Sequence, residues 1–163
     1  MLVTISSAVC GLSIFSLKKD LLDELASFCL MLEIIQGELA NRLSPVPELA
    51  QSVRKKINGK AKSFMEVLII NLNFLGERNL ETIWCESLKA CGAELGNAEM
   101  DALMSLGKII GRYDVQTQCD AISNTLMLLR SSLNQKRNEL PQLGRLYLGL
   151  PMSAGAILAI LLV

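Results

Sequence analysis

Apolar residues recur along most of this chain at the spacing of one helix face. Between residues 20 and 43 the intervals are 4, 3, 4, 3 and 4, at Leu21, Leu25, Phe28, Leu32, Ile35 and Leu39. The same intervals separate Val115, Cys119, Ile122, Leu126, Leu129 and Leu133. Heptad-like stripes of this kind are typical of long helices that pack against each other. We therefore predict one long helix over each stripe, and we expect the two helices to pair antiparallel through their stripes.

Four shorter helices are predicted between the two long ones. The first covers residues 47–57 and follows Ser44-Pro45-Val46-Pro47, because a residue before proline is driven out of the α region. The others cover residues 62–75, 80–91 and 98–110, with glycines near their ends. No segment alternates with period two, so we expect no sheet. The predicted fold class is all-α, a six-helix bundle with one core.

Each end of the chain carries an uncharged apolar segment. Residues 146–163 read LYLGLPMSAGAILAILLV. At about 1.5 Å per residue, a helix of that length would cross most of a hydrocarbon core about 30 Å thick. Residues 2–17 form the second segment, and Lys18 and Lys19 follow it directly. We predict transmembrane helices at residues 1–17 and 146–163, and we expect Pro141 and Pro151 to kink the last helix.

The N-terminal segment admits other interpretations. A signal peptide carries positive charge before its apolar run, whereas here both lysines follow the run. Sixteen residues are short for a span, so an interfacial helix remains open. Lys18, Lys19 and Arg145 flank the inner ends of the two segments. The positive-inside rule then places residues 18–145, the predicted helical domain, in the cytoplasm and both termini outside.

Composition excludes several classes of function. Among 163 residues, 16 basic side chains balance 16 acidic ones, so no net field favours nucleic acid. The absence of histidine removes histidine triads, histidine proton shuttles and histidine metal sites. The five cysteines include no C-x-x-C pair, and we interpret them as small core residues in a reducing compartment. We predict no enzyme activity, no catalytic residues, no metal and no cofactor.

One basic stretch is a candidate contact site. Gly59-Lys60-Ala61-Lys62-Ser63 resembles the end of a phosphate-binding loop, but Arg54 stands where that loop needs glycine, and no strand is predicted before it. The stretch carries five cations with no acid between Glu48 and Glu66: Arg54, Lys55, Lys56, Lys60 and Lys62. A solvated turn is the simpler interpretation. A docking patch for an acidic partner is the alternative.

Several single residues also have predicted roles. Asp114 precedes the last helix and is predicted to be its N-cap, while Gln118 is assigned either to packing or to a partner contact. Trp84 is interpreted as a core anchor, with an interface contact as the alternative. In the terminal segments, small residues lie four apart, a spacing that lets membrane helices approach closely: Ser7 with Gly11, and Gly155 with Ala159.

Four short motifs are spread along the chain. They are Glu38-Leu39 with Ser44-Pro45-Val46, Trp84-Cys85-Glu86-Ser87-Leu88, the stretch 106–114 with Gln118, and Arg145-Leu146-Tyr147. In order and spacing they resemble the stage III sporulation protein AB family of endospore-forming bacteria. The matching residues are Glu38, Pro45, Trp84, Gly107, Gly111, Asp114, Gln118 and Tyr147. The chain departs from the family pattern at Asn41-Arg42, where the family has Tyr-Gly, and at Pro151, where it has a glycine-rich segment.

The resemblance implies a role that the residues alone do not give. The family belongs to a channel complex in the mother-cell membrane around the forespore, and it is similar to the platform protein of type II secretion. It implies a non-catalytic platform that couples a cytoplasmic ATPase to membrane subunits. Its implied partners are other stage III sporulation A proteins and membrane lipid but no nucleic acid, with a homo-oligomer left open. The alternative is a two-span protein with an unrelated regulatory or enzymatic helical domain.

Overall fold

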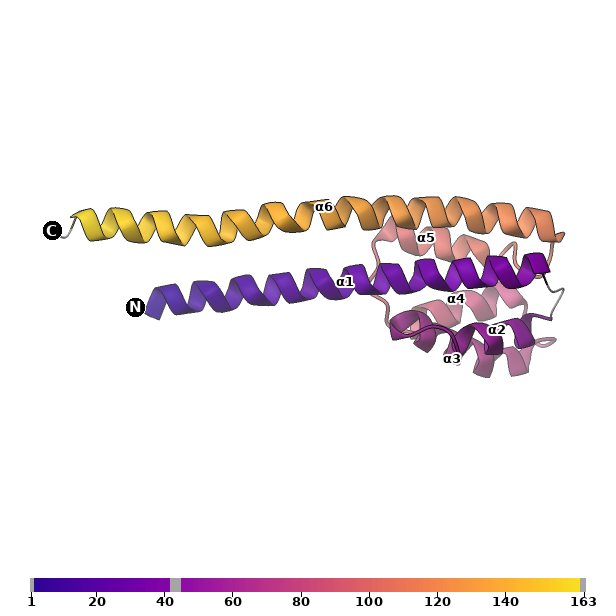
Figure 1. Ribbon diagram of the computed structural model, residues 1–163. Coiled ribbons are helices and arrows are strands. Elements are labelled where there is room, and N and C mark those ends of the chain that lie inside the picture. Colours follow the sequence, from indigo (N-terminus) through magenta and orange to yellow (C-terminus); the bar gives the residue numbers. More distant parts are fainter. Residues whose placement is uncertain (1, 42–44, 162–163) are drawn as a thin grey trace. The chain divides into compact units, whose positions relative to one another are not determined.

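The computed structural model describes the backbone of residues 2–41 and 45–161, and the side chains of residues 19–41 and 45–138. This part of the chain is helical (Figure 1): α1 (Leu2–Asn41), α2 (Val46–Arg54), α3 (Gly59–Asn71), the 3₁₀ turn η1 (Leu72–Phe74), α4 (Leu80–Ala90), α5 (Asn97–Leu106) and α6 (Val115–Leu161). Within it there is no strand, only an isolated bridge between Leu75 and Arg78. The predicted all-α class and the six helices are confirmed.

The backbone separates into two compact units. One is Asp23–Leu133, and the other combines Met1–Leu22 with Asn134–Val163. The predicted spans, residues 1–17 and 146–163, lie outside the residues whose side chains are described. Among the residues that are described, no helix is both long enough and apolar enough to cross a membrane. The two spans therefore stay a prediction.

The two long helices extend further than their apolar stripes. α1 is one helix from Leu2 to Asn41 rather than a helix that starts near residue 20. α6 continues from Val115 to Leu161, through Pro141 and Pro151, without a break in the helix. The predicted kinks at these two prolines remain a prediction.

Local sequence signals set the ends of the shorter helices. Pro45 is the N-cap of α2, and α2 ends at Arg54, three residues before the predicted end. α3 begins at Gly59, where a φ of +66° favours glycine. α4 begins after Asn79, whose side chain accepts a hydrogen bond of 2.8 Å from the backbone N–H of Thr82.

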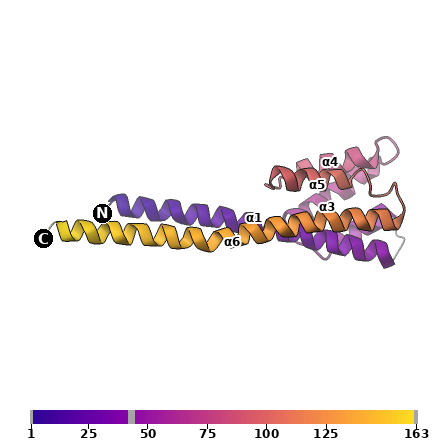
Figure 2. The same ribbon diagram turned by 90° about the horizontal axis from the view of Figure 1, so that it is seen from above.

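Within the unit Asp23–Leu133, α1 and α6 lie side by side (Figures 1 and 2). Arg130 Nη2 donates to Glu33 Oε1 at 2.6 Å, and Gln36 Nε2 donates to Ser123 Oγ at 2.6 Å. Later residues of α1 therefore meet earlier residues of α6, which confirms the antiparallel pairing. Most of both stripes is buried: Leu25, Phe28, Leu32, Ile35 and Leu39 in α1, and Ile122, Leu126 and Leu129 in α6.

Part of the α1 stripe packs against the short helices, and the direct contact between the two stripes stays a prediction. Phe28 contacts Phe64 of α3, with ring centroids 6.3 Å apart. Ile35 lines a cavity together with residues of α2, α3 and α4. The side of α1 that meets α6 carries Glu33 and Gln36, which lie beside the stripe and not within it. Phe28 and Ile35 of α1 therefore belong to the part of the core that the short helices cover.

Candidate functional site

Trp84 of α4 joins α3, α4 and α5 at the centre of the core. Only 2% of it is exposed, and its Nε1–H donates a 2.8 Å hydrogen bond to the backbone oxygen of Leu103. Its ring meets Phe64 edge-on, with centroids 4.9 Å apart and an interplanar angle of 75°. A Cβ atom on Gly107 would lie 2.8 Å from Trp84 Cδ1, so only glycine fits there. Both motif residues serve the packing of the core.

The turn from α5 to α6 is closed by Gly111 and Gln118. Gly111 has a φ of +78°, and an added Cβ would lie 2.8 Å from Leu80 Cδ2. The Gly111 N–H donates to Gln118 Oε1 at 3.1 Å, and Gln118 Nε2 donates to the Tyr113 carbonyl at 2.6 Å. Gln118 is 6% exposed, so its amide satisfies backbone groups of this turn. Of the two roles left open for Gln118, the structure favours packing.

Asp114 caps the N-terminus of α6, as its position predicts. The Thr117 N–H donates to Asp114 Oδ1 at 3.0 Å, and the Thr117 hydroxyl donates to Asp114 Oδ2 at 2.6 Å. The hydroxyl bond first, and then the backbone bond, hold the pKa of Asp114 below its ordinary value, because both favour the carboxylate.

Glu38 connects α1 to α2 and to the turn that follows α2. Its Oε1 accepts a 2.7 Å bond from Lys56 Nζ and a 3.0 Å bond from Ser52 Oγ. Pro45 is the N-cap of α2. The two motif residues Glu38 and Pro45 therefore both lie at the connection between α1 and α2. The remaining motif residue, Tyr147, lies outside the described side chains.

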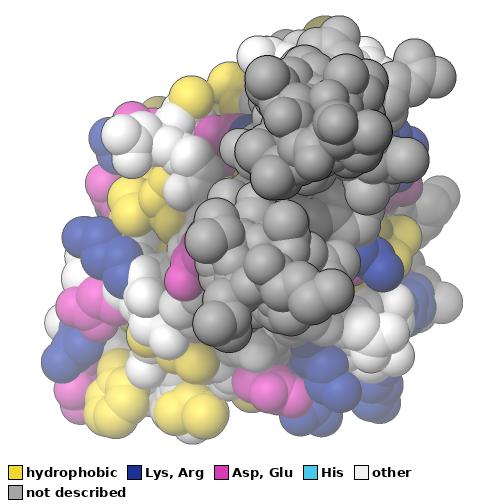
Figure 3. All heavy atoms as spheres, turned by 90° about the vertical axis from the view of Figure 1, so that its left-hand side faces the viewer, with side chains coloured by type: hydrophobic (Ala, Val, Ile, Leu, Met, Phe, Trp, Pro, Cys, Tyr) yellow, Lys and Arg dark blue, Asp and Glu magenta, His cyan; other side chains and the backbone are white. Residues whose placement is uncertain are grey.

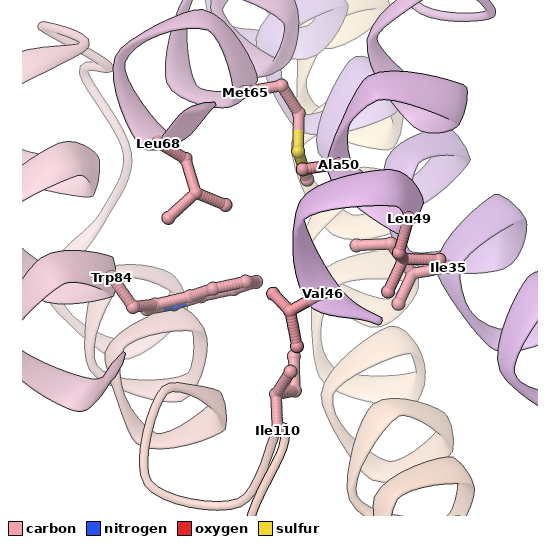
Figure 4. A pocket seen from close by; sticks show the side chains of 8 residues that line it. All are labelled: Ile35, Val46, Leu49, Ala50, Met65, Leu68, Trp84 and Ile110. Carbon is pink, nitrogen blue, oxygen red and sulfur yellow. The ribbon is translucent and has the colours of Figure 1, made fainter. Parts of the chain in front are cut away.

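A small apolar cavity lies beside Trp84. Figure 4 shows Leu68, Met65 and the indole of Trp84 around it, and its eight lining residues are all apolar: Ile35, Val46, Leu49, Ala50, Met65, Leu68, Trp84 and Ile110. Its volume is about 10 Å³, the lower limit for one water molecule. It has neither the size nor the polar groups of a substrate site.

The predicted basic cluster is only partly available for a partner. Lys56 forms an ion pair with Glu38 of α1, so the absence of acids between Glu48 and Glu66 does not leave all five cations without a partner. Within the described residues the other four, Arg54, Lys55, Lys60 and Lys62, form no ion pair with an acid. We call these four the basic turn. On the face that Figure 3 shows, Lys and Arg side chains and Asp and Glu side chains both occur over the surface that is not grey.

The basic turn is held against α1 and the α4–α5 loop. Gly59 lies next to Ser27, whose Oγ would be 3.7 Å from an added Cβ, and Lys60 Nζ lies 3.6 Å from the corresponding position on Gly92. Lys55 is exposed, whereas Arg54, Lys60 and Lys62 are half-buried. Arg54 ends α2 and Lys55 is its C-cap, whereas Lys60 and Lys62 lie in the first turn of α3.

The cysteines match small core residues. Cys29 and Cys91 are buried, Cys85 and Cys119 are half-buried, and these four are free thiols. Burial raises the pKa of Cys29, Cys85 and Cys91 above the ordinary thiol value, which disfavours the reactive thiolate. Cys10 lies outside the described side chains. Across the described residues no cluster of cysteine and acidic side chains could hold a metal ion.

Two features were missed at the level of the sequence. The ion pair of Glu38 and Lys56 spans 18 residues and has no local signal. The exposed side of α1 carries a second row of residues at intervals of 4 and 3, namely Lys19, Asp23, Ala26, Leu30, Glu33, Gly37 and Ala40. The spacing can be read from the sequence. A search for large apolar residues does not find this row, because most of its members are small or charged.

Comparison with known proteins decides the family. The family model described as stage III sporulation protein AB matches residues 1–163. The chain belongs to the stage III sporulation protein AB family. A solved structure titled "Stage III sporulation protein AB (SpoIIIAB)" is similar to it, with a TM-score of 0.64 and 19% sequence identity, over 71% of this chain and 92% of that chain. No curated protein matches the chain. The helical fold of this chain is therefore similar to that of the solved stage III sporulation protein AB structure.

Proposed function

We propose that this protein is a non-catalytic platform in the stage III sporulation complex of the mother-cell membrane. Family membership supports a sporulation role. The non-catalytic part of the proposal rests on the structural roles of the motif residues. Trp84, Gly107, Gly111 and Gln118 are all engaged in packing or in closing turns, and the adjacent cavity is too small for a substrate. These motif residues therefore have structural roles, and contacts with partner proteins are made by the surface.

The platform couples a cytoplasmic ATPase to the membrane subunits of the complex, which are other stage III sporulation A proteins. The basic turn supports this contact, because four cations without an acidic partner among the described residues favour an acidic surface. A contact of this kind weakens as salt screens it, with a Debye length of about 8 Å at physiological ionic strength. The chain itself binds no nucleotide, since α3 begins at Gly59 directly after a helix and a turn, without the strand that a phosphate-binding loop requires.

The test is a pull-down of the ATPase with a double variant, Arg54→Glu and Lys55→Glu. Lys56 is left in place because its charge is already paired with Glu38. The matched control is Lys89→Glu with Lys108→Glu, which makes the same change of charge at two exposed lysines on other elements.

The expected result is that the first variant loses at least ten-fold in ATPase binding while the control binds as the natural chain does. Equal binding by both variants would place the contact elsewhere on the surface. ATP binding by the purified chain would overturn the platform itself. Deletion of the gene is expected to block spore formation, and normal spores would contradict the sporulation role.

A further inference from the structure

Three large apolar side chains are exposed where α3 passes through η1 into the loop before α4. Ile70 is 61% exposed, and Phe74 and Leu75 are each 47% exposed. Ile70 and Phe74 are four residues apart along continuous helical backbone, so they lie about one turn apart on the same side. We call these three residues the α3 apolar patch. Turns usually carry polar residues, and grouped apolar side chains on a surface are typical of sites that bind another molecule.

The backbone and one cation hold the α3 apolar patch in this exposed arrangement. The backbone N–H groups of Glu77 and Arg78 both donate to the Phe74 carbonyl, each at 3.1 Å. Gly76 has a φ of +116°, a conformation that other residues rarely adopt. The guanidinium of Arg78 lies 5.8 Å from the centre of the Phe74 ring and donates a 3.0 Å hydrogen bond to Glu86 Oε2. The ring is therefore positioned in advance, which lowers the entropy cost of binding.

Two acidic side chains without an ion pair border the α3 apolar patch. Glu66 lies one helical turn before the patch in α3, and Glu77 follows the patch in the loop. Both are exposed, and within the described residues neither carboxylate forms an ion pair. Arg78 does not balance them, because it is paired with Glu86. Lys62, four residues before Glu66, forms no ion pair with it. The patch therefore has a negative border.

We propose that the α3 apolar patch binds a segment of another protein that carries apolar side chains next to lysine or arginine. The apolar side chains of that segment cover the patch, and its cations meet Glu66 and Glu77. The negative border disfavours a membrane surface, because cytoplasmic leaflets carry anionic lipids. It disfavours nucleic acid for the same reason, since phosphates are negative as well.

A second copy of this chain is a poorer match for the α3 apolar patch. The basic turn has four cations, but the other exposed large apolar residues of the described chain all lie outside it, at Leu30, Tyr113, Met127 and Leu128. The basic turn of a second copy therefore meets the acids but leaves the patch uncovered. Tyr113 lies beside Arg112, but this cation is paired with Glu81, and Tyr113 alone does not match three exposed side chains. We therefore assign the segment to a different protein.

Photo-cross-linking of the full-length chain, in the cells that make it, tests the proposal. Phe74 is replaced by the photoreactive amino acid p-benzoylphenylalanine, which keeps an aromatic ring at this position. The control places the same amino acid at Lys89, an exposed position of α4. After irradiation the chain is purified, and mass spectrometry identifies the peptide that is joined to it.

The expected product joins position 74 to a peptide of another protein in which lysine or arginine stands among apolar residues. It should be at least ten-fold more abundant than any product at position 89. Adding Ile70→Asn, which removes an exposed apolar side chain, should reduce the product at least five-fold. Glu66→Lys with Glu77→Lys should reduce it by a similar factor, because the reversed charges repel the cations of the segment. The matched pair Glu94→Lys with Asp101→Lys, at exposed acids on other parts of the chain, should change it less than two-fold.

The chemistry of the joined peptide and its dependence on the patch decide the outcome, not the identity of the captured protein. Equal yields at positions 74 and 89 would overturn the proposal. A product with a lipid, with an acidic peptide or with a peptide of this same chain would also overturn it, since each is a different occupant. An equal loss in the two charge-reversed pairs would reject the role of Glu66 and Glu77. Because all of the residues concerned lie within the unit Asp23–Leu133, these results do not depend on the proposed platform function.

Discussion

Gly107 lies against the indole ring of Trp84, and a Cβ atom on residue 107 would come within 2.8 Å of both Trp84 Cδ1 and Cγ. Real Cβ contacts are not that short, so the change Gly107→Ala must displace the ring or the backbone. We expect it to lower the free energy of unfolding by about 1–3 kcal/mol, as overpacking of a core does.

A matched control for this prediction is Gly37→Ala. Residue 37 lies inside α1 and has open space around its Cβ position, so alanine should be neutral or stabilise by up to about 1 kcal/mol. Trp84 is the single tryptophan of the chain, so its fluorescence during denaturation of the full-length protein in detergent follows this site directly. Equal stability of the two variants would show that the core accommodates residue 107 easily.

The cap of α6 should make stability depend on pH in the acidic range. The pKa of Asp114 is lowered in the folded chain, while in the unfolded chain it is about 3.9. The carboxylate therefore contributes stability above about pH 4, and that contribution is lost as the pH falls through the lower folded value. Asp114→Asn keeps a good N-cap but cannot titrate. Melts between pH 2 and pH 7 should show a smaller loss in acid for this variant, and identical pH profiles would contradict the assignment.

Burial of the inner stripe predicts unequal costs for the same substitution. Leu25 is fully buried, whereas Leu133 is only half-buried at the end of its stripe. Leu25→Asp should destabilise the chain by several kcal/mol, because it places a charge in the core. Leu133→Asp should cost clearly less, since water still reaches its carboxylate. Thermal melts of both variants test this order, with Leu30→Asp on the exposed side as a near-neutral control.

Topology gives a prediction that the described residues do not test. Lys18, Lys19 and Arg145 flank the inner ends of the two apolar segments, so both termini should lie outside the cytoplasm. Alkaline phosphatase, which is active only outside the cytoplasm, should be active when fused after Val163. A fluorescent protein that matures only in the cytoplasm should remain dark at the same position. The opposite pair of results would reverse the topology.

Periodicity was enough to predict the helices, because each stripe reports the side of a helix that the core covers. The cap at Asp114 could also be predicted, since a cap depends only on the adjacent turn. The fit of Gly107 against Trp84 could not, because 23 positions separate the two residues and only the packed helices bring them together. The same holds for Glu38 and Lys56. The basic cluster looked unpaired in the sequence because its acid comes from another helix.

The pairing of α1 with α6 also fixes the order in which the chain can fold during synthesis. Glu33 and Arg130 are 97 residues apart, and ribosomes add about 5–20 residues per second. Roughly 5–20 seconds therefore pass between the appearance of Glu33 and that of its partner. During that interval α2, α3 and α4 can already cover Phe28 and Ile35, but the side of α1 with Glu33 and Gln36 waits for α6. A nascent chain stalled before Ile122 would hold an open bundle, and such a chain is a natural target for proteases and chaperones.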